Sequence, residues 1–230
     1  MKTRHERLNA LAELNQAQRY LEIGVCDADT FDRVTVAHKV GVDPHFRFDP
    51  ASRRGPDVEL HALPSDAYFA ALPDTTPPFD LIFLDGLHTY AQTLRDLHAT
   101  FALSHARTIW LIDDTCPDSA LSADPDMTSS IAAKRALGVP DRGWMGDVFK
   151  VVAAVHDTMP DLRLRTFANL GQTVVWRAPR DPFTPVWGRL DAIAALTYDD
   201  FVAHGHDVFA RSRPEAIVAE VRETLSRTAP

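Results

Sequence analysis

The chain has 230 residues, of which 45% are hydrophobic, and a formal net charge of -8, which suits one generous domain that buries a full core without disulfides or zinc. The acidic balance and the absence of a basic run argue against nucleic-acid binding through phosphates. Cys26 and Cys116 lie far apart, and neither a signal peptide nor a membrane-spanning run is evident, so we expect a cytoplasmic protein that binds no membrane.

Short apolar and β-branched runs alternate with helix-compatible segments from residue 19 onward. This alternation is typical of a mainly parallel sheet covered by helices on both faces. Strands are predicted at residues 19–25, 38–43, 58–63, 79–86 and 107–114, and helices at 29–35, 65–72 and 89–104.

A polar loop follows residue 114 and leads to helix-like segments at 131–138 and 147–159, the second capped by Asp147. Segments 162–169 and 171–178 predict a closing antiparallel pair with a turn at Asn169 to Gly171. We assign residues 1–178 to one α/β domain. Residues 179–230, with helix-like segments at 191–204 and 214–226, are expected to form a helical extension, packed on that domain or on the partner subunit of a homodimer.

The predicted parallel strands end in acidic residues. The C-terminal ends of parallel strands meet at one edge of a sheet, where ligands bind. A phosphate-binding crevice would avoid such a row of anions, and no arginine is evident to balance it, whereas a cationic or hydroxyl-rich ligand suits it. The residues concerned are Glu22 with Gly24, Asp43, Asp85 followed by His88, and Asp113 with Asp114.

Two of these residues have alternative interpretations. Asp43 suits an acid that accepts hydrogen bonds from a ribose diol, and it equally suits a turn residue before Pro44. His88 stands at the start of a predicted helix, where the helix dipole favours a neutral base while nearby carboxylates favour the imidazolium. Alternatively, His88 and Thr89 merely cap that helix.

The acids also suggest a metal site. If the fourth and fifth strands are neighbours, about 4.8 Å apart, Asp85 and Asp113 can bring their carboxylates to one point. Converging oxygen ligands suit Mg²⁺. Alternatively, Asp114 caps a turn and the acids lie on a solvated rim.

The stretches Y-L-E-I-G-V, K-V-G-V-D-P, F-D-L-I-F-L-D-G-L-H-T-Y, L-I-D-D-T-C-P and W-M-G-D-V-F-K together resemble the class I S-adenosylmethionine-dependent methyltransferases. The resemblance runs from about Tyr20 to Arg177, and it is closest to the small branch of macrocin- and mycinamicin-type and rhamnosyl O-methyltransferases. It implies a Rossmann-like, doubly wound, mainly parallel seven-stranded sheet in the order 3-2-1-4-5-7-6, with residues 1–178 as the methyltransferase domain.

The resemblance also implies a role for each matching residue. Ala28 stands where relatives usually have glycine, which would cost on the order of 1 kcal/mol if that position needs a positive φ. For the cofactor, Glu22, Gly24 and Val25 match the first cofactor motif, Asp43 matches the ribose-binding acid, Ser65 and Asp66 match the adenine segment, and Asp85 matches a residue of the cofactor edge. For the metal, Asp85 and Asp113 match the ligands of metal-dependent members, with Asp114 beside them. His88 matches the catalytic base.

The function implied is O-methylation of a hydroxyl on a small molecule, a sugar or secondary metabolite. S-adenosylmethionine is the expected cofactor, and Mg²⁺ is an optional one that would activate the hydroxyl. A nicotinamide-dependent oxidoreductase is the main alternative, but G-V-C-D-A-D lacks the later glycines of a pyrophosphate loop. A methyltransferase-like binding protein without catalysis is the other.

Overall fold

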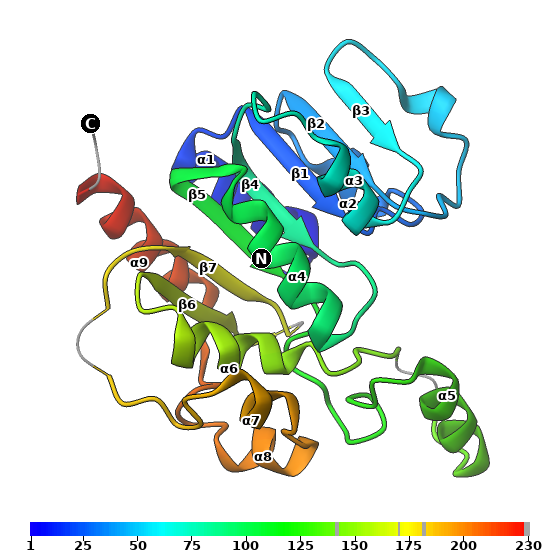
Figure 1. The fold of residues 1–230 in the computed structure, drawn as a ribbon, viewed down its shortest axis with the longest axis vertical. Helices are drawn as coiled ribbons and strands as arrows, with labels where there is room; N and C mark the ends of the chain where they lie inside the picture. Colours follow the sequence, from blue (N-terminus) through cyan, green and yellow to red (C-terminus); the bar gives the residue numbers. More distant parts are fainter. Residues whose placement is uncertain (141–142, 170, 181–182, 228–230) are drawn as a thin grey trace.

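The computed structural model describes residues 1–140, 143–169, 171–180 and 183–227. Its centre is an eight-stranded sheet in the order β3-β2-β1-β4-β5-β7-β6-β8 (Figure 1). The strands are β1 Arg19–Ile23, β2 His38–Val42, β3 Val58–His61, β4 Phe79–Leu84, β5 Ser104–Ile112, β6 Leu162–Phe167, β7 Thr173–Arg177 and β8 Arg211–Ser212.

The predicted order of the first seven strands is confirmed. Strands β1 to β5 are mutually parallel where they pair, and β7 is antiparallel to both β5 and β6. The short strand β8, which was not predicted, adds to the β6 edge in parallel. The turn predicted between β6 and β7 includes Leu170, which lies outside the described residues.

Helices cover both faces of the sheet. One face packs against α3, α4 and α6, and the other against α1, α2 and α9. In the described part of the chain, no helix is both long and apolar enough to cross a membrane. The helices are α1 Arg4–Asn15, α2 Asp29–Arg33, η1 Pro50–Arg53, α3 Ser65–Ala71, α4 Tyr90–Phe101, α5 Met127–Ala136, α6 Phe149–Thr158, α7 Leu190–Ala194, α8 Tyr198–Ala203 and α9 Pro214–Arg227.

The C-terminal segment differs in detail from the prediction. Residues 191–204 form two helices, because Thr197 begins α8 with a capping box that it makes with Asp200. The last helix, α9, buries Ile217, Val221 and Leu225 in the same apolar cluster as α1. The division at residue 178 and the homodimer stay predictions.

The strand register aligns the candidate site residues. Ile23 pairs with Val42 on one side and with Leu84 on the other, and Leu84 pairs with Ile112. The residues that follow these positions therefore leave the sheet at one level: they are Gly24, Asp43, Asp85 and Asp113.

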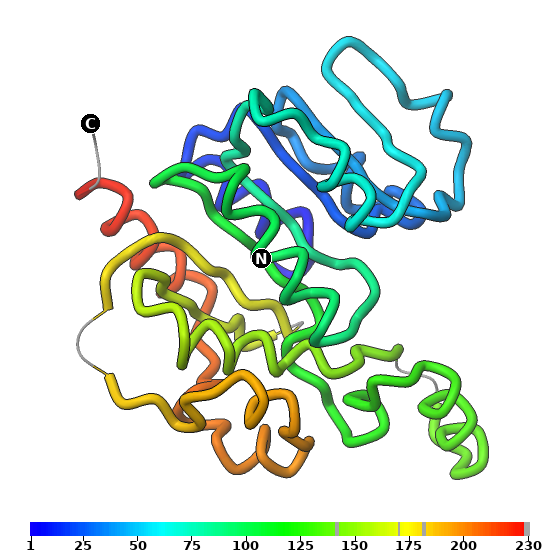
Figure 2. The backbone as a smooth tube through the Cα atoms, viewed as in Figure 1, coloured from blue at the N-terminus to red at the C-terminus, as the bar shows by residue number. Residues whose placement is uncertain are grey.

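Between β5 and α6 the chain leaves the sheet, forms α5 and returns (Figure 2). The backbone N–H of Met145 donates to the carbonyl of Ser122 at 3.1 Å, and the indole N–H of Trp144 donates to the carbonyl of Asp124 at 2.6 Å. These bonds hold residues 144–145 of this loop against residues 122–124, beside the C-terminal ends of β4 and β5.

Candidate active site

The loop after β1 contains three residues in the left-handed region. Gly24 has a φ of 91°, and Cys26 and Ala28 have φ values of 52° and 68°. A Cβ at Gly24 would lie 1.9 Å from the carbonyl oxygen of Asp85, so only glycine allows this approach of β1 to β4. Ala28 has the positive φ for which the sequence predicts a cost, and an alanine in this left-handed conformation destabilises the loop by roughly 1–2 kcal/mol. Val25 is buried, and its contact with a cofactor stays a prediction.

Asp43 fixes this loop against the end of β2. One carboxylate oxygen accepts a hydrogen bond from the N–H of Cys26 at 2.8 Å, and the other accepts one from the N–H of His45 at 2.7 Å. The bond to His45 is that of a turn residue. An ionised carboxylate offers about four lone-pair sites, so two are left for a ribose diol, and that role stays a prediction.

The turn between β4 and α4 positions His88. Thr89 is the N-cap of α4 and accepts a hydrogen bond from the N–H of Gln92 at 3.4 Å. His88 precedes this cap, with a left-handed φ of 57°. The capping interpretation therefore holds for Thr89 alone.

Asp147, in the turn just before α6, stabilises this turn between β4 and α4. Its Oδ1 accepts a hydrogen bond from the N–H of Tyr90 at 2.7 Å, and Lys150 pairs with it at 2.9 Å. Helix α6 has Val148 as its N-cap, with no side-chain cap. The prediction that Asp147 caps its own helix is thus wrong, because its carboxylate is taken by the start of α4.

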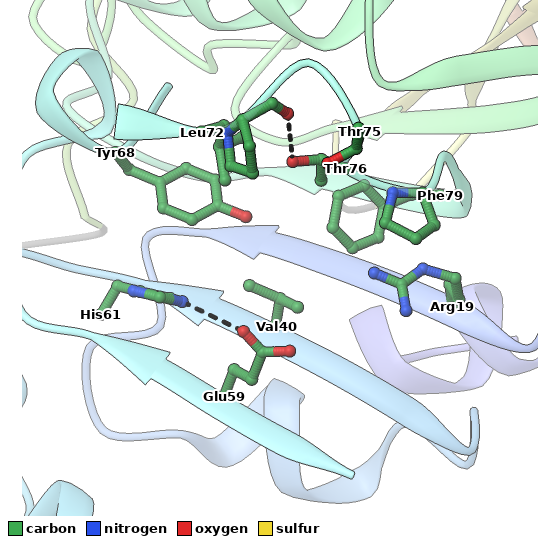
Figure 3. A pocket seen from close by; sticks show the side chains of 11 residues that line it. Arg19, Val40, Glu59, His61, Tyr68, Leu72, Thr75, Thr76 and Phe79 are labelled. Atoms are coloured by element: carbon green, nitrogen blue, oxygen red, sulfur yellow. Dashed lines mark hydrogen bonds and ion pairs between the residues drawn. The ribbon is translucent and has the colours of Figure 1, made fainter. Parts of the chain in front are cut away.

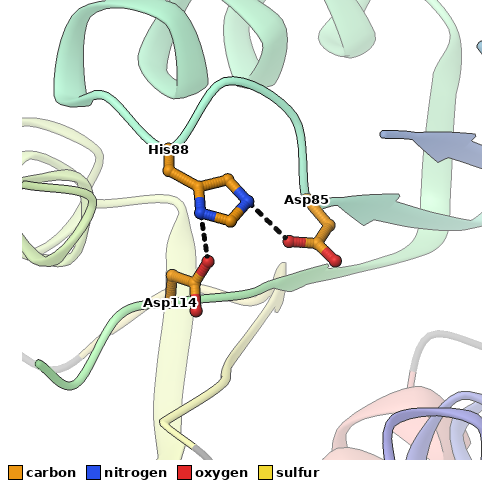
Figure 4. A group of neighbouring side chains, drawn as sticks. All are labelled: Asp85, His88 and Asp114. Carbon is orange, nitrogen blue, oxygen red and sulfur yellow. Dashed lines mark ion pairs between the residues drawn. The ribbon is translucent and has the colours of Figure 1, made fainter. Parts of the chain in front are cut away.

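The imidazole of His88 lies between two carboxylates (Figure 4). Its Nε2 is 3.3 Å from Oδ1 of Asp85, and its Nδ1 is 2.8 Å from Oδ2 of Asp114. The three side chains offer ligand atoms within 4.8 Å of one another. Asp114, like His88, has a φ of 57°, so two of the three residues hold a conformation that costs free energy.

Asp113 points to a different cation. Arg4 of α1 forms an ion pair with Asp113, and its Nε lies 3.9 Å from Oδ2 of Asp85. The second oxygen of Asp113 accepts a hydrogen bond from the N–H of Asp114 at 2.9 Å. The expectation that no arginine balances the acidic edge is wrong, because α1 places Arg4 over it. The two carboxylates predicted to bind a metal, those of Asp85 and Asp113, therefore both lie beside Arg4.

Burial and mutual repulsion shift the protonation of this group. Burial and the charge of Asp85 raise the pKa of Asp113 to about 6, although Arg4 lowers it. Burial also raises the pKa of Asp85 and of Asp114. Burial lowers the pKa of His88, but its bonds to Asp114 and Asp85 outweigh that effect and raise the pKa to about 11. With these partners His88 is an imidazolium at neutral pH, so the carboxylates override the helix dipole.

The segment that returns from α5 covers His88. The Trp144 ring stacks on the imidazole with a centroid distance of 5.4 Å and an interplanar angle of 17°. Gly146 has a φ of 62°, and a Cβ there would lie 1.7 Å from the carbonyl oxygen of His88. Neither Trp144 nor Arg4 is predicted as a site residue from the sequence. The only signal for Trp144 is its place in W-M-G-D, and Arg4 carries none.

The remaining predicted residues lie around this group. Gln92 of α4 donates to Ser65 Oγ at 3.1 Å and to Asp66 Oδ1 at 3.0 Å, so these two form a separate polar cluster between α3 and α4. Glu22 is buried and accepts a hydrogen bond from the Tyr20 hydroxyl at 2.6 Å. Burial raises the pKa of Glu22 well above its ordinary value. Contact of these residues with a cofactor stays a prediction.

The crevice beside His88 is narrow. It leaves no room for a water-sized molecule, whereas sites for small organic ligands span roughly 300–1,000 Å³. Side chains at this edge must therefore move before a nucleoside-sized ligand enters. The crevice is lined by Leu84, Asp85, Gly86, His88, Thr93, Asp113, Asp114 and Val148.

Two buried carboxylate oxygens in this group, Oδ1 of Asp85 and Oδ2 of Asp114, face the two nitrogens of His88. Carboxylate oxygens and a neutral imidazole nitrogen are ligands of divalent cations. Asp85, His88 and Asp114 offer such ligand atoms close together, whereas Asp113 is paired with Arg4. The metal site stays a prediction.

The strand order, with β7 inserted antiparallel beside β5, matches the methyltransferase fold. Residues 9–115, just under half of the chain, match the family model described as a methyltransferase domain. This match includes Gly24, Asp43, Asp85 and His88. The match and the fold together show that this chain is similar to methyltransferases.

Solved O-methyltransferases share this fold at low sequence identity. The O-methyltransferase TomG from Streptomyces achromogenes, solved with S-adenosylmethionine, is 19% identical over 76% of this chain and 79% of its own, with a TM-score of 0.54. An O-methyltransferase from Bacillus cereus, in complex with S-adenosylhomocysteine, is 14% identical over 77% and 82%, with a TM-score of 0.52. Podospora anserina methyltransferase PaMTH1 is 17% identical over 77% and 80%, with a TM-score of 0.50. No curated protein matches the sequence.

Proposed function

We propose that the chain transfers a methyl group from S-adenosylmethionine to a hydroxyl of a small molecule, a sugar or secondary metabolite. The observation that carries this proposal is the convergence of Asp85, His88 and Asp114 at the edge of a methyltransferase-type sheet, next to the loop after β1. Carboxylates attract a cationic sulfonium and repel a pyrophosphate, which disfavours a nicotinamide cofactor. The L-D-G-L-H-T-Y resemblance favours the sugar O-methyltransferase branch.

The loop after β1 and the end of β2 would hold the cofactor. Gly24 lets the loop turn closely over Asp85, and Asp43 holds the N–H of Cys26 while keeping lone pairs for a ribose. Ser65 and Asp66 open α3 at the same edge and suit the adenine end. S-adenosylmethionine would supply an electrophilic methyl group on a sulfonium.

His88 would remove the proton of the acceptor hydroxyl. Nδ1 is held by Asp114 at 2.8 Å, whereas Nε2 faces Asp85 at the longer distance of 3.3 Å, so Nε2 is the atom that would accept the proton. An imidazolium cannot do so. A cation held by the same carboxylates would lower the pKa of His88, and the neutral imidazole could then accept the proton. General-base catalysis of this kind contributes about 10²- to 10⁴-fold.

A divalent cation such as Mg²⁺ would be held by Asp85 and Asp114, whose carboxylates lie close together beside His88. When bound it would lower the pKa of a coordinated substrate hydroxyl. Asp113 stays paired with Arg4 in this arrangement. Asp114→Asn should then abolish any Mg²⁺-dependent rise in melting temperature, a readout that needs no substrate.

The experiment compares His88→Gln with His98→Gln, which replaces an exposed histidine of α4 outside the site. S-adenosylhomocysteine should raise the melting temperature of both variants and of the wild type. Mass spectrometry with a panel of deoxysugar glycosides should show methylated product that His88→Gln reduces by about 100-fold or more. Wild-type turnover in His88→Gln would show that His88 is not the base. Stabilisation by NAD in place of S-adenosylhomocysteine would overturn the proposal. S-adenosylhomocysteine binding without product would favour a binding protein.

A further inference from the structure

A cavity of about 300 Å³ lies between α3 and the sheet (Figure 3). Val40, Leu72 and Phe79 give it apolar walls, and Arg19 and Tyr68 extend polar groups into it. Arg19 is the first residue of β1, so it lies at the other end of that strand from Gly24. The cavity is therefore separate from the group around His88.

The guanidinium of Arg19 has no hydrogen-bond acceptor among the residues that the structure describes. Its Nε is buried without a partner, and its only described neighbour of note is the Phe79 ring, 5.1 Å from Cζ. Arginine carries five N–H donors in a planar fork. A buried donor without an acceptor costs stability, so this fork favours any acceptor that enters the cavity.

The neighbouring acids are already taken. Asp80 accepts hydrogen bonds from the backbone N–H groups of Gln18 and Arg19 at 2.8 Å, and lies 2.9 Å from Nε2 of His105. Glu59, which lines the cavity, is 3.2 Å from Nε2 of His38. Neither carboxylate forms an ion pair with the Arg19 side chain in the described part of the chain. Glu59 also lies 3.6 Å from Nε2 of His61, so its carboxylate is turned toward the two histidines.

Tyr68 provides a second free donor. The residue is 4% exposed, and its hydroxyl has no partner in the described ranges of the chain. In Figure 3 the hydroxyl points from α3 toward the middle of the cavity, and the Arg19 guanidinium points toward the same space from β1. Burial raises the pKa of Tyr68, so the hydroxyl stays protonated and can donate.

We propose that this cavity binds a small monocarboxylate with a short apolar body. The Arg19 fork would take both carboxylate oxygens, as guanidinium and carboxylate pair side by side. The Tyr68 hydroxyl would donate to one of them, and the body would lie against Val40, Leu72 and Phe79. A phosphate would bring more charge than one guanidinium and one hydroxyl satisfy. This site is independent of the proposed methyl transfer.

The test uses benzoate as the charged probe and benzamide as its uncharged analogue of the same shape. The full chain is saturated with S-adenosylhomocysteine, so that neither probe occupies the proposed cofactor site, and binding is followed by NMR of ring-labelled tyrosine. Benzoate should bind with a Kd of about 1 mM and shift the Tyr68 signal. Benzamide should bind about tenfold more weakly or not at all.

Arg19→Gln and Tyr68→Phe test the two donors. Arg19→Gln should weaken benzoate binding at least about tenfold, and Tyr68→Phe by about three- to tenfold. The matched control is Arg53→Gln, since Arg53 also stacks on a phenylalanine, Phe48, at 4.2 Å but does not line the cavity. It should leave the Kd unchanged.

Three results would overturn the proposal. They are no benzoate binding at about 20 mM, equal binding of benzoate and benzamide, and an unchanged Kd in Arg19→Gln. A crystal structure of the benzoate complex gives an independent readout if a variant fails to fold, and a carboxylate found away from Arg19 would be equally decisive against the site.

Discussion

Replacing Asp114 with asparagine removes one of the two carboxylates that hold His88 as an imidazolium. The Oδ2 of Asp114 is 2.8 Å from Nδ1, closer than the 3.3 Å between Asp85 and Nε2, so Asp114 makes the larger contribution. A neighbouring opposite charge shifts a pKa by about 1–3 units. The pKa of His88, raised to about 11 by both acids, should therefore fall by that amount in Asp114→Asn.

The assay is an NMR pH titration of protein labelled at histidine Cε1, with His88→Gln identifying the resonance. In the wild type the His88 signal should show no inflection between pH 5 and about 9, and in Asp114→Asn its midpoint should move down. A wild-type midpoint near 6.5, or an equal midpoint in both proteins, would refute the reasoning.

The same shift predicts how stability depends on pH. A histidine whose folded pKa lies above its unfolded value stabilises the fold fully below pH 6.5, and the contribution is lost as pH rises toward 11. The wild type should therefore lose about 1.4 kcal/mol of unfolding free energy per pH unit between pH 7 and 9, relative to His88→Gln measured over the same range. Urea denaturation at the two pH values provides this difference, and parallel losses in both proteins would contradict the linkage.

Three further substitutions have defined outcomes. Gly146→Ala should lower the free energy of unfolding by more than about 2 kcal/mol, since its Cβ would overlap the carbonyl of His88 at 1.7 Å; an unchanged urea midpoint would show that the loop moves freely. Asp43→Asn, measured without any cofactor, should lower the free energy of unfolding by about 1–2 kcal/mol and so lower the melting temperature, because it weakens the hydrogen bonds from Cys26 and His45. A role in binding ribose alone predicts no change in the melting temperature. Arg4→Gln should cost about 1 kcal/mol at pH 8, since its side chain is 47% exposed, and less at pH 5. Asp113 has a folded pKa of about 6, raised above its ordinary value, so its ionisation opposes folding as pH rises through 6. Equal losses at the two pH values in urea denaturation would argue against this pairing.

The sheet order and the meeting of Gly24, Asp43, Asp85 and His88 at one edge could be predicted because both follow from local patterns. Parallel strands of apolar residues align their C-terminal ends whatever the helices do. The charge balance at that edge could not be predicted, because it depends on Arg4. No motif marks Arg4, and it reaches Asp113 only through the packing of α1.

Side-chain direction was equally out of reach. Asp113 and Asp114 are adjacent, and strand alternation alone would send them to opposite faces, so choosing the one that meets His88 requires the left-handed backbone of Asp114. Asp147 shows the same limit of prediction from sequence. Its position suits the cap of α6, but its carboxylate accepts a hydrogen bond from the N–H of Tyr90 at the start of α4.

The packing of α1 against α9 also bears on when the site forms during synthesis. Helix α1 carries Arg4, and α9 is docked on the sheet by Ile217 and Val221 and by a 2.8 Å bond from Arg107 to the carbonyl of Leu225. A nascent chain can pair β1 to β5 before α9 has been synthesised, and α1 packs directly on β4 and β5 as well as on α9. Helix α1 can therefore bring Arg4 to the acidic edge once β4 and β5 have formed, and α9 then stabilises that arrangement.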